Sequence, residues 1–406
     1  MFPHCVHHWI PILGIVLLLP GRLIAQDPPA EIQVEQEHFQ SRKQQGHHAL
    51  LKGRRWLEQQ QEHSGGWQSK SYASLESRVA TSALVMSTLV EPTSAGVEQK
   101  ETINRGLLFL KSKINQGEIG QSVEAESNYP LYSISLMLAT LNQFQPETTA
   151  NRELRDALSR ELLRRQRIMH SGRVSEGDVA GGWGPGSDSF YQGAAANPAN
   201  ISVTYFALAA LSGAQRLPLK SRFAALDYLQ HCQVPADAAG AGGFVFTFLS
   251  DHPLNKAGSQ RSPSGKRYGV PYLSATCDGI SALLACDVPA DDRRVQTAIH
   301  VLPQLTHARL AVLPLSAESL PAYQKLDALF FYEAAATTRV WKQLKERGVE
   351  NSYLNARCHE ILRTLIARQQ ADGHWENPLP WMMEDDPLIA TTFALQALHR
   401  CLAPAE

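Results

Sequence analysis

Two kinds of helix-length segment alternate along the chain, and they differ in where their apolar residues fall. The first kind is apolar nearly all round and rich in Ala, Ser, Thr and Leu, which is typical of helices buried on most sides. The six segments of this kind are 77–90, 130–144, 201–214, 273–286, 328–340 and 387–402.

A charged amphipathic segment precedes each apolar one. Its apolar residues recur at spacings of three and four, as Leu107, Leu110 and Ile114 do, which predicts a helix with one face on a core and one in water. The six segments of this kind are 47–61, 98–116, 152–167, 219–233, 291–307 and 353–370.

Six amphipathic–apolar pairs spaced roughly 50–75 residues apart indicate a helical repeat array. An open array leaves two raw ends that need capping, whereas six pairs can close on themselves. The sequence therefore predicts an all-α protein, an (α/α)6 barrel or toroid with six inner apolar helices and six outer amphipathic helices.

The first residues of the chain have the pattern of a signal peptide that is cleaved off, and they are not expected to be part of the folded domain. Residues 10–20 form a short apolar run, and a small residue, Ala25, follows before the polar chain begins. We expect a signal peptide over 1–25, a polar and partly disordered leader over 26–45, and a single toroid domain over 46–406, exported to the periplasm or beyond. The apolar run is too short for a membrane-spanning helix, and we expect no transmembrane segment in the mature chain.

The outer segments end in a recurring pattern of Gln, then Gly, then an aromatic residue. We expect the Gln to bind free carbonyls of the last helical turn, the Gly to adopt a left-handed C-cap, and the aromatic ring to cover the helix end. This clasp is a structural feature. Its residues are Gln61, Gly65, Trp67, Trp183, Phe244, Gln369, Gly373 and Trp375.

The clasps, over about Gly53 to Leu402, resemble the QW repeat of squalene and oxidosqualene cyclases. The same toroid occurs in protein prenyltransferase beta subunits. The Gly181-Gly-Trp-Gly184 stretch and the Asn200–Leu208 segment also look like secreted bacterial proteins with prenyltransferase and squalene oxidase repeats. The resemblance implies an (α/α)6 barrel and much less about chemistry, because fold does not fix function.

The catalytic signatures of the family are absent. The chain contains no Asp-x-Asp-Asp acid of squalene-hopene-type cyclases and no Asp-Asp-x-x-Asp for magnesium. The nearest analogue of the prenyltransferase zinc motif, Cys277-Asp278, has the wrong order and spacing. We therefore expect no metal and no cofactor. The acids at 384–386 precede the last apolar segment, and we expect them to stabilise the positive end of that helix, with a substrate-facing cluster as the alternative.

The balance of charged residues bears on which partners the protein can bind. The chain has 38 Lys+Arg against 39 Asp+Glu, a formal charge of −1. This balance gives no electrostatic reason for nucleic-acid binding, and we expect none.

The remaining signal is polar residues on or beside the apolar segments. A lone acid in a buried helix is costly unless it is bonded or faces a wet cavity, and a closed ring supplies such a cavity. We expect a partly acidic, aromatic-lined pocket; inter-helix hydrogen bonds alone are the alternative. The candidate cavity and rim residues are Glu126, Tyr132, Tyr205, Asp278, Asp327, Tyr332, Glu333, Asp385 and Asp386.

Three functions fit this reading. The first is a binding protein whose cavity holds an apolar or glycan-like molecule, or that binds a protein partner. The second is a diverged cyclase-like enzyme that uses Asp278 or Glu333 as a general acid. The third is a polysaccharide lyase or hydrolase, which paired carboxylates across the cavity would favour.

Overall fold

The computed structural model describes residues 30–72, 75, 77–91, 97–115, 129–143, 148–166, 181–184, 198–251, 254–307 and 326–403. The chain divides into two units, Met1–Ser41 and Arg42–Glu406, and the ring of helices belongs to the second. Helix α1 spans Ala30–Gln59, so it begins inside the predicted leader. The Glu, Gln and Lys residues of that stretch are polar but favour helix, and polarity alone suggested disorder. The predicted signal peptide, 1–25, lies outside the described residues, and export stays a prediction.

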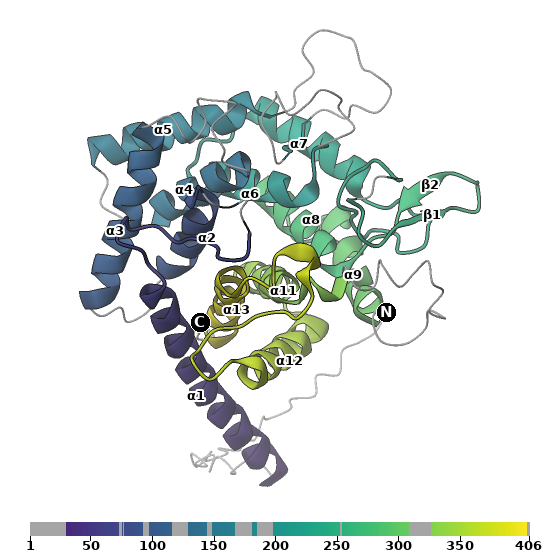
Figure 1. Cartoon of the computed structure of the whole chain (residues 1–406). Coiled ribbons are helices and arrows are strands. Elements are labelled where there is room, and N and C mark those ends of the chain that lie inside the picture. The colour runs from purple at the N-terminus through teal and green to yellow at the C-terminus, as the bar shows by residue number, and fades with distance from the viewer. Residues whose placement is uncertain are drawn as a thin grey trace, which may run out of the picture. The chain divides into compact units, whose positions relative to one another are not determined.

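Six helices form an inner ring (Figure 1). They are α2 (Val79–Leu89), α4 (Pro130–Gln143), α6 (Ile201–Gly213), α8 (Leu273–Ala285), α11 (Phe330–Lys345) and α13 (Pro387–Leu402). Each packs against the next in chain order, and α13 packs against α2, so the ring is closed. These helices match the six apolar segments within a few residues at each end, which confirms the all-α toroid prediction.

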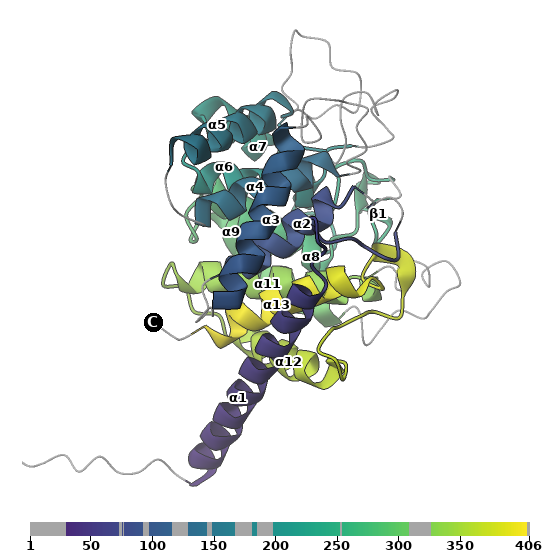
Figure 2. The same ribbon diagram turned by 60° about the vertical axis from the view of Figure 1, so that its left-hand side comes forward.

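The outer layer consists of the amphipathic helices (Figure 2). They are α1 from residue 42 on, α3 (Val97–Asn115), α5 (Thr149–Arg164), α7 (Leu219–Cys232), α9 (Arg293–His307) and α12 (Ser352–Arg368). The outer helices α3, α5, α7, α9 and α12 each pack on one or two neighbouring inner helices. Burial follows the sequence pattern: α8 buries twelve of its 13 residues, whereas α5 buries five of 16.

The clasps join three elements at once. In the last clasp, Gln369 Nε2 donates to the carbonyls of Gly373 and Ala49, so it ties its own loop to α1. Gln61 does the same toward Gly65 and Thr102 of α3. The prediction that the Gln binds the last turn of its own helix was therefore wrong. The Gln amide points outward from the helix end and reaches the adjacent outer helix.

The aromatic residue of each tryptophan clasp binds the helix end instead. Trp67 Nε1 donates to Leu57 O at 2.7 Å, Trp183 Nε1 to Leu162 O at 2.7 Å and Trp375 Nε1 to Leu365 O at 2.8 Å. The backbone N–H of the aromatic residue donates to a Ser or Thr of the following inner helix, and Phe244 shares this bond through Thr276. All four rings are fully buried.

Two clasp glycines have a positive φ, as expected, but they lie in the loop and do not cap a helix: α12 ends at Arg368 with Gln369 as its C-cap, and α1 ends at Gln59. Gly65 has φ of 89° and Gly373 has φ of 111°. A Cβ at Gly65 would also lie 2.5 Å from Arg105 O, so a side chain is excluded by both strain and space.

The long connection from α7 to α8 carries the short hairpin of β1 (Ser259–Arg261) and β2 (Arg267–Gly269), with Gln260 opposite Tyr268. Within the described ranges, no helix is both long and apolar enough to cross a membrane.

Candidate functional site

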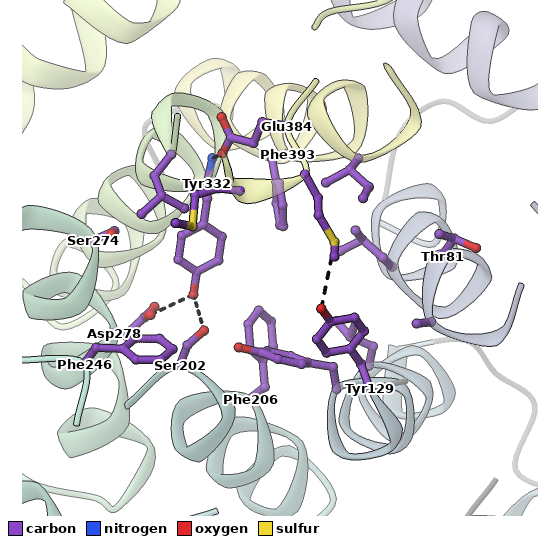
Figure 3. Close-up of a pocket in the computed structure, with 18 of the residues that line it drawn as sticks. Thr81, Tyr129, Ser202, Phe206, Phe246, Ser274, Asp278, Tyr332, Glu384 and Phe393 are labelled. Carbon is purple, nitrogen blue, oxygen red and sulfur yellow. Dashed lines mark hydrogen bonds between the residues drawn. The ribbon is translucent and has the colours of Figure 1, made fainter. Parts of the chain in front are cut away.

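A cavity of about 350 Å³ lies inside the ring. Every inner helix contributes to its wall: Ala80 from α2, Leu136 from α4, Phe206 from α6, Asp278 from α8, Tyr332 from α11 and Phe393 from α13. Figure 3 shows Phe206, Phe393 and Tyr332 turned toward this space. The wall is mostly apolar and aromatic, and its polar groups are few.

Asp278 is the buried acid on α8, and it is ion-paired. Its Oδ1 lies 2.5 Å from Nη2 of Arg339 on α11. The guanidinium also donates to Ser281 Oγ at 3.1 Å and lies 3.8 Å above the centroid of the Tyr205 ring. Burial raises the pKa of Asp278, while Arg339 opposes this shift. With an arginine so close and so well bonded, Asp278 is held as a carboxylate.

Hydroxyl groups extend from Asp278 into the cavity. The Tyr332 hydroxyl donates to Asp278 Oδ2 at 2.7 Å, and it lies 2.6 Å from Ser202 Oγ of α6 (Figure 3). Tyr132 of α4 lies beside them, and its hydroxyl also interacts with Ser202. Burial raises the pKa of Tyr132 and of Tyr332 above the ordinary tyrosine value, so both keep their proton.

Glu384 is a second carboxyl on the cavity wall. Its two oxygens accept the backbone N–H groups of Phe331 at 2.8 Å and Tyr332 at 2.7 Å, where α11 begins. Burial raises the pKa of Glu384 to about 8, although these two bonds and that of the Asn377 amide oppose the shift. A carboxyl that keeps its proton near neutral pH can donate it.

The segment that carries Glu384 is anchored on both sides. Met382 and Met383 of this segment line the cavity, and the Tyr129 hydroxyl contacts Met383 Sδ. The Tyr72 hydroxyl donates to Asp385 and lies 3.1 Å from the carbonyl oxygen of Pro380. These contacts hold the residues before α13 against the cavity.

Asp386 is the N-cap of α13. Its Oδ1 accepts the backbone N–H of Leu388 at 2.9 Å and of Ile389 at 3.3 Å, while Ser69 Oγ donates to Oδ2 at 2.6 Å. The prediction that the acids at 384–386 stabilise the following helix is confirmed for Asp386. Glu384 serves the start of α11 instead, because the chain before α13 passes that helix end.

The structure gathers some predicted site residues and separates others. Asp278, Tyr332 and Tyr132 line the cavity together. Tyr205 lies behind the wall, packed on Arg339. Asp327 accepts a bond from Asn377 Nδ2 through its backbone carbonyl, and its side chain is not part of the lining. Glu126 lies outside the described residues.

Glu333 does not reach the cavity. It is buried on α11, and its Oε1 lies 3.5 Å from Nη2 of Arg357 on α12. The position of Glu333 between the inner and outer layers is therefore a correction to its predicted place in the pocket. Conversely, sequence reasoning did not single out Arg339 or Ser202, and it named Glu384 only within the acid cluster at 384–386, whose substrate-facing role was the alternative. The sequence signal for these residues was weak: Arg339 lies near the end of one apolar segment, and Glu384 lies just before another.

The described ranges contain no group of three or more His, Cys, Asp or Glu side chains placed to hold a metal ion. One lysine, Lys256, is part of the cavity wall, with its ammonium 3.6 Å from the centroid of the Phe246 ring.

No family model matches the chain, and no curated protein matches it. Solved structures do. The type II terpene cyclase MstE from Scytonema, in complex with its product merosterolic acid A, is 14% identical over 89% of this chain and 98% of that chain, with a TM-score of 0.55. The same enzyme in complex with its substrate geranylgeranyl dihydroxybenzoate is 12% identical over 89% and 99%, with a TM-score of 0.55.

A second kind of enzyme has the same architecture. An inactive variant of the α-1,6-mannanase of Salegentibacter sp. HEL1_6, in complex with α-1,6-mannotriose, is 10% identical over 88% of this chain and 99% of that chain, with a TM-score of 0.55. At these identities the likeness establishes the fold. The chain is an α/α toroid, and its function has to be argued from its own cavity.

Proposed function

We propose that this protein binds an elongated apolar molecule of the isoprenoid class in its central cavity. The observation that carries the proposal is the wall of that cavity, to which all six inner helices contribute and which is mostly aromatic and aliphatic. Its volume of about 350 Å³ lies in the range of small-molecule sites. The complex of the terpene cyclase MstE with a geranylgeranyl compound is consistent with this proposal, because it shows that a toroid of this fold can hold such a molecule.

The cavity is a poor match to a glycan-cleaving site. Such a site needs two carboxyl groups free to act on either side of a glycosidic bond. Of the two cavity carboxyls, Asp278 is ion-paired with Arg339, so only Glu384 is left to act and the required pair is missing. The likeness to a mannanase therefore extends to the fold without its chemistry.

A displacement experiment tests the proposal. The fluorescent apolar probe N-phenyl-1-naphthylamine is bound to the protein and challenged with geranylgeraniol or with α-1,6-mannotriose. We expect geranylgeraniol to displace the probe and mannotriose to leave it bound. Ala80→Phe, which fills the cavity wall at α2, should weaken geranylgeraniol binding at least tenfold. The matched control is Ala367→Phe on the exposed face of α12. Equal binding by both variants would place the ligand elsewhere and contradict the proposal.

A second candidate function is acid-catalysed conversion of the bound isoprenoid, and Glu384 favours it. Asp278 is committed to Arg339 and Glu333 lies outside the cavity, whereas Glu384 lines the cavity with a pKa raised by burial to about 8. A carboxylic acid of this kind can protonate an alkene. Incubation with geranylgeraniol, followed by gas chromatography with mass spectrometry, should give a cyclised or hydrated product that Glu384→Gln does not form. No product with the wild-type protein leaves binding as the whole function.

A further inference from the structure

The number of hydrogen atoms available determines which hydroxyl group donates in each hydrogen bond near Asp278. Asp278 is a carboxylate and can only accept, so the single hydrogen of the Tyr332 hydroxyl goes to Asp278 Oδ2, 2.7 Å away. Ser202 then donates its one hydrogen either to the Tyr332 oxygen, 2.6 Å away, or directly to Asp278, with which it also forms a hydrogen bond. All the hydroxyl hydrogens along this chain of bonds point toward Asp278.

The hydroxyl group at the cavity end of this series of hydrogen bonds can therefore only accept a further hydrogen bond. Once Ser202 has donated its hydrogen, its oxygen keeps lone pairs and no hydrogen. The Tyr132 hydroxyl also bonds Ser202, and because Ser202 has already given its hydrogen, Tyr132 is the donor. The oxygen left free to accept at the cavity end is therefore that of Tyr132. This oxygen can accept a hydrogen bond from a ligand, but it has no hydrogen to give to a ligand oxygen. A ligand hydroxyl gains a bond there, whereas a ligand oxygen that can only accept loses its bonds to water and finds no donor.

We propose that Tyr132, Ser202, Tyr332 and Asp278 form an acceptor pole that selects apolar ligands with a hydroxyl group, that is, long-chain isoprenoid alcohols. The inference rests on the proposed function and narrows it. Ethers, ketones and esters offer only acceptor oxygens to this pole, and a carboxylate or phosphate adds negative charge beside Asp278. A hydrocarbon leaves the pole without a donor. Of these classes, only the alcohol supplies the hydrogen that the pole lacks.

The test compares ligands that share one chain. Geranylgeraniol, its methyl ether, the corresponding hydrocarbon and geranylgeranoic acid are each used to displace N-phenyl-1-naphthylamine from the protein. We expect the alcohol to bind about tenfold more tightly than the ether or the hydrocarbon, the ratio that one hydrogen bond provides. The acid should bind more weakly than the alcohol.

Variants assign the preference to the pole. Ser202→Ala should bring the alcohol-to-ether ratio close to one while the affinity for the hydrocarbon is unchanged. Tyr332→Phe is a second variant for comparison: Ser202 can still donate to Asp278, so the alcohol-to-ether ratio should stay well above one. The matched control is Ser112→Ala on outer helix α3, whose hydroxyl donates to Phe109 O. It should keep the wild-type ratio.

The outcomes separate the two proposals. If the probe and all four ligands fail to bind, the proposed function itself is wrong. If alcohol, ether and hydrocarbon bind equally well, the cavity binds isoprenoids but the acceptor pole does not select them. Tighter binding of the acid would also overturn the inference and would point to Lys256 on the cavity wall. A ratio that stays high in Ser202→Ala would assign selectivity to other residues.

Discussion

At the scale of single residues, the orientation of a side chain around its helix decides its role. Tyr332 and Glu333 are neighbours on α11, and a turn of about 100° per residue separates their directions. Tyr332 consequently faces the cavity, and Glu333 faces α12 and Arg357. The sequence shows that both are polar residues in an apolar segment. It does not show how α11 is rotated in the ring, and this is why Asp278 was placed correctly and Glu333 was not.

Glu384 gives a prediction at the same scale, in the pH dependence of stability. Its pKa in the folded protein is raised by burial from 4.5 to about 8, so between these values the folded state holds a proton that the unfolded state has lost. Stability should therefore fall as pH rises from about 5 to about 8, by at most about 1.4 kcal/mol per pH unit from this group.

Chemical denaturation across this pH range measures the effect. Glu384→Gln should show a flatter pH profile, together with a loss of about 1 kcal/mol at low pH from a weakened cap on α11. Glu153→Gln on the exposed face of α5 is the control and should keep the wild-type slope. An equally steep profile in Glu384→Gln would assign the pH dependence to other groups.

At the scale of elements, the sequence was sufficient to locate the helices. The predicted segment 387–402 coincides with α13, and 201–214 differs from α6 by a single residue. The apolar content of the inner helices and the three-and-four spacing of the outer ones are local signals, which is why they could be read. The partners of the clasp glutamines could not be read, because Gln369 binds Ala49, which is 320 positions away in the sequence.

Because the clasp glutamine ties two adjacent outer helices together, we expect its removal to lower the free energy of unfolding. Gln369→Ala removes the bonds to Gly373 O and Ala49 O, and should lower the free energy of unfolding by about 1–3 kcal/mol. Gln370→Ala is the matched control, since the neighbouring Gln370 is exposed, and it should change stability by less than about 0.5 kcal/mol. Urea unfolding of the two variants makes the comparison. Equal stability would mean that the clasp orders the loop without supporting the ring.

At the scale of the whole ring, closure brings polar residues from distant parts of the chain together around one cavity. Asp278, Ser202, Tyr332 and Glu384 come from different parts of the chain, and they meet because α13 returns to pack on α2. The pattern of six helix pairs predicted this closure, and closure predicted a cavity. The pairing of Asp278 with Arg339 and the approach of Glu384 to α11 depend on long-range packing, for which the sequence has no local signal.

The most direct test of the account is an experimental structure of the protein grown with geranylgeraniol. The account predicts ligand density inside the six-helix ring, between Phe206 and Phe393, with the ligand oxygen within hydrogen-bond distance of Ser202 or Tyr132. Side chains that fill the centre of the ring, or a ligand bound only on the outer helices, would contradict it.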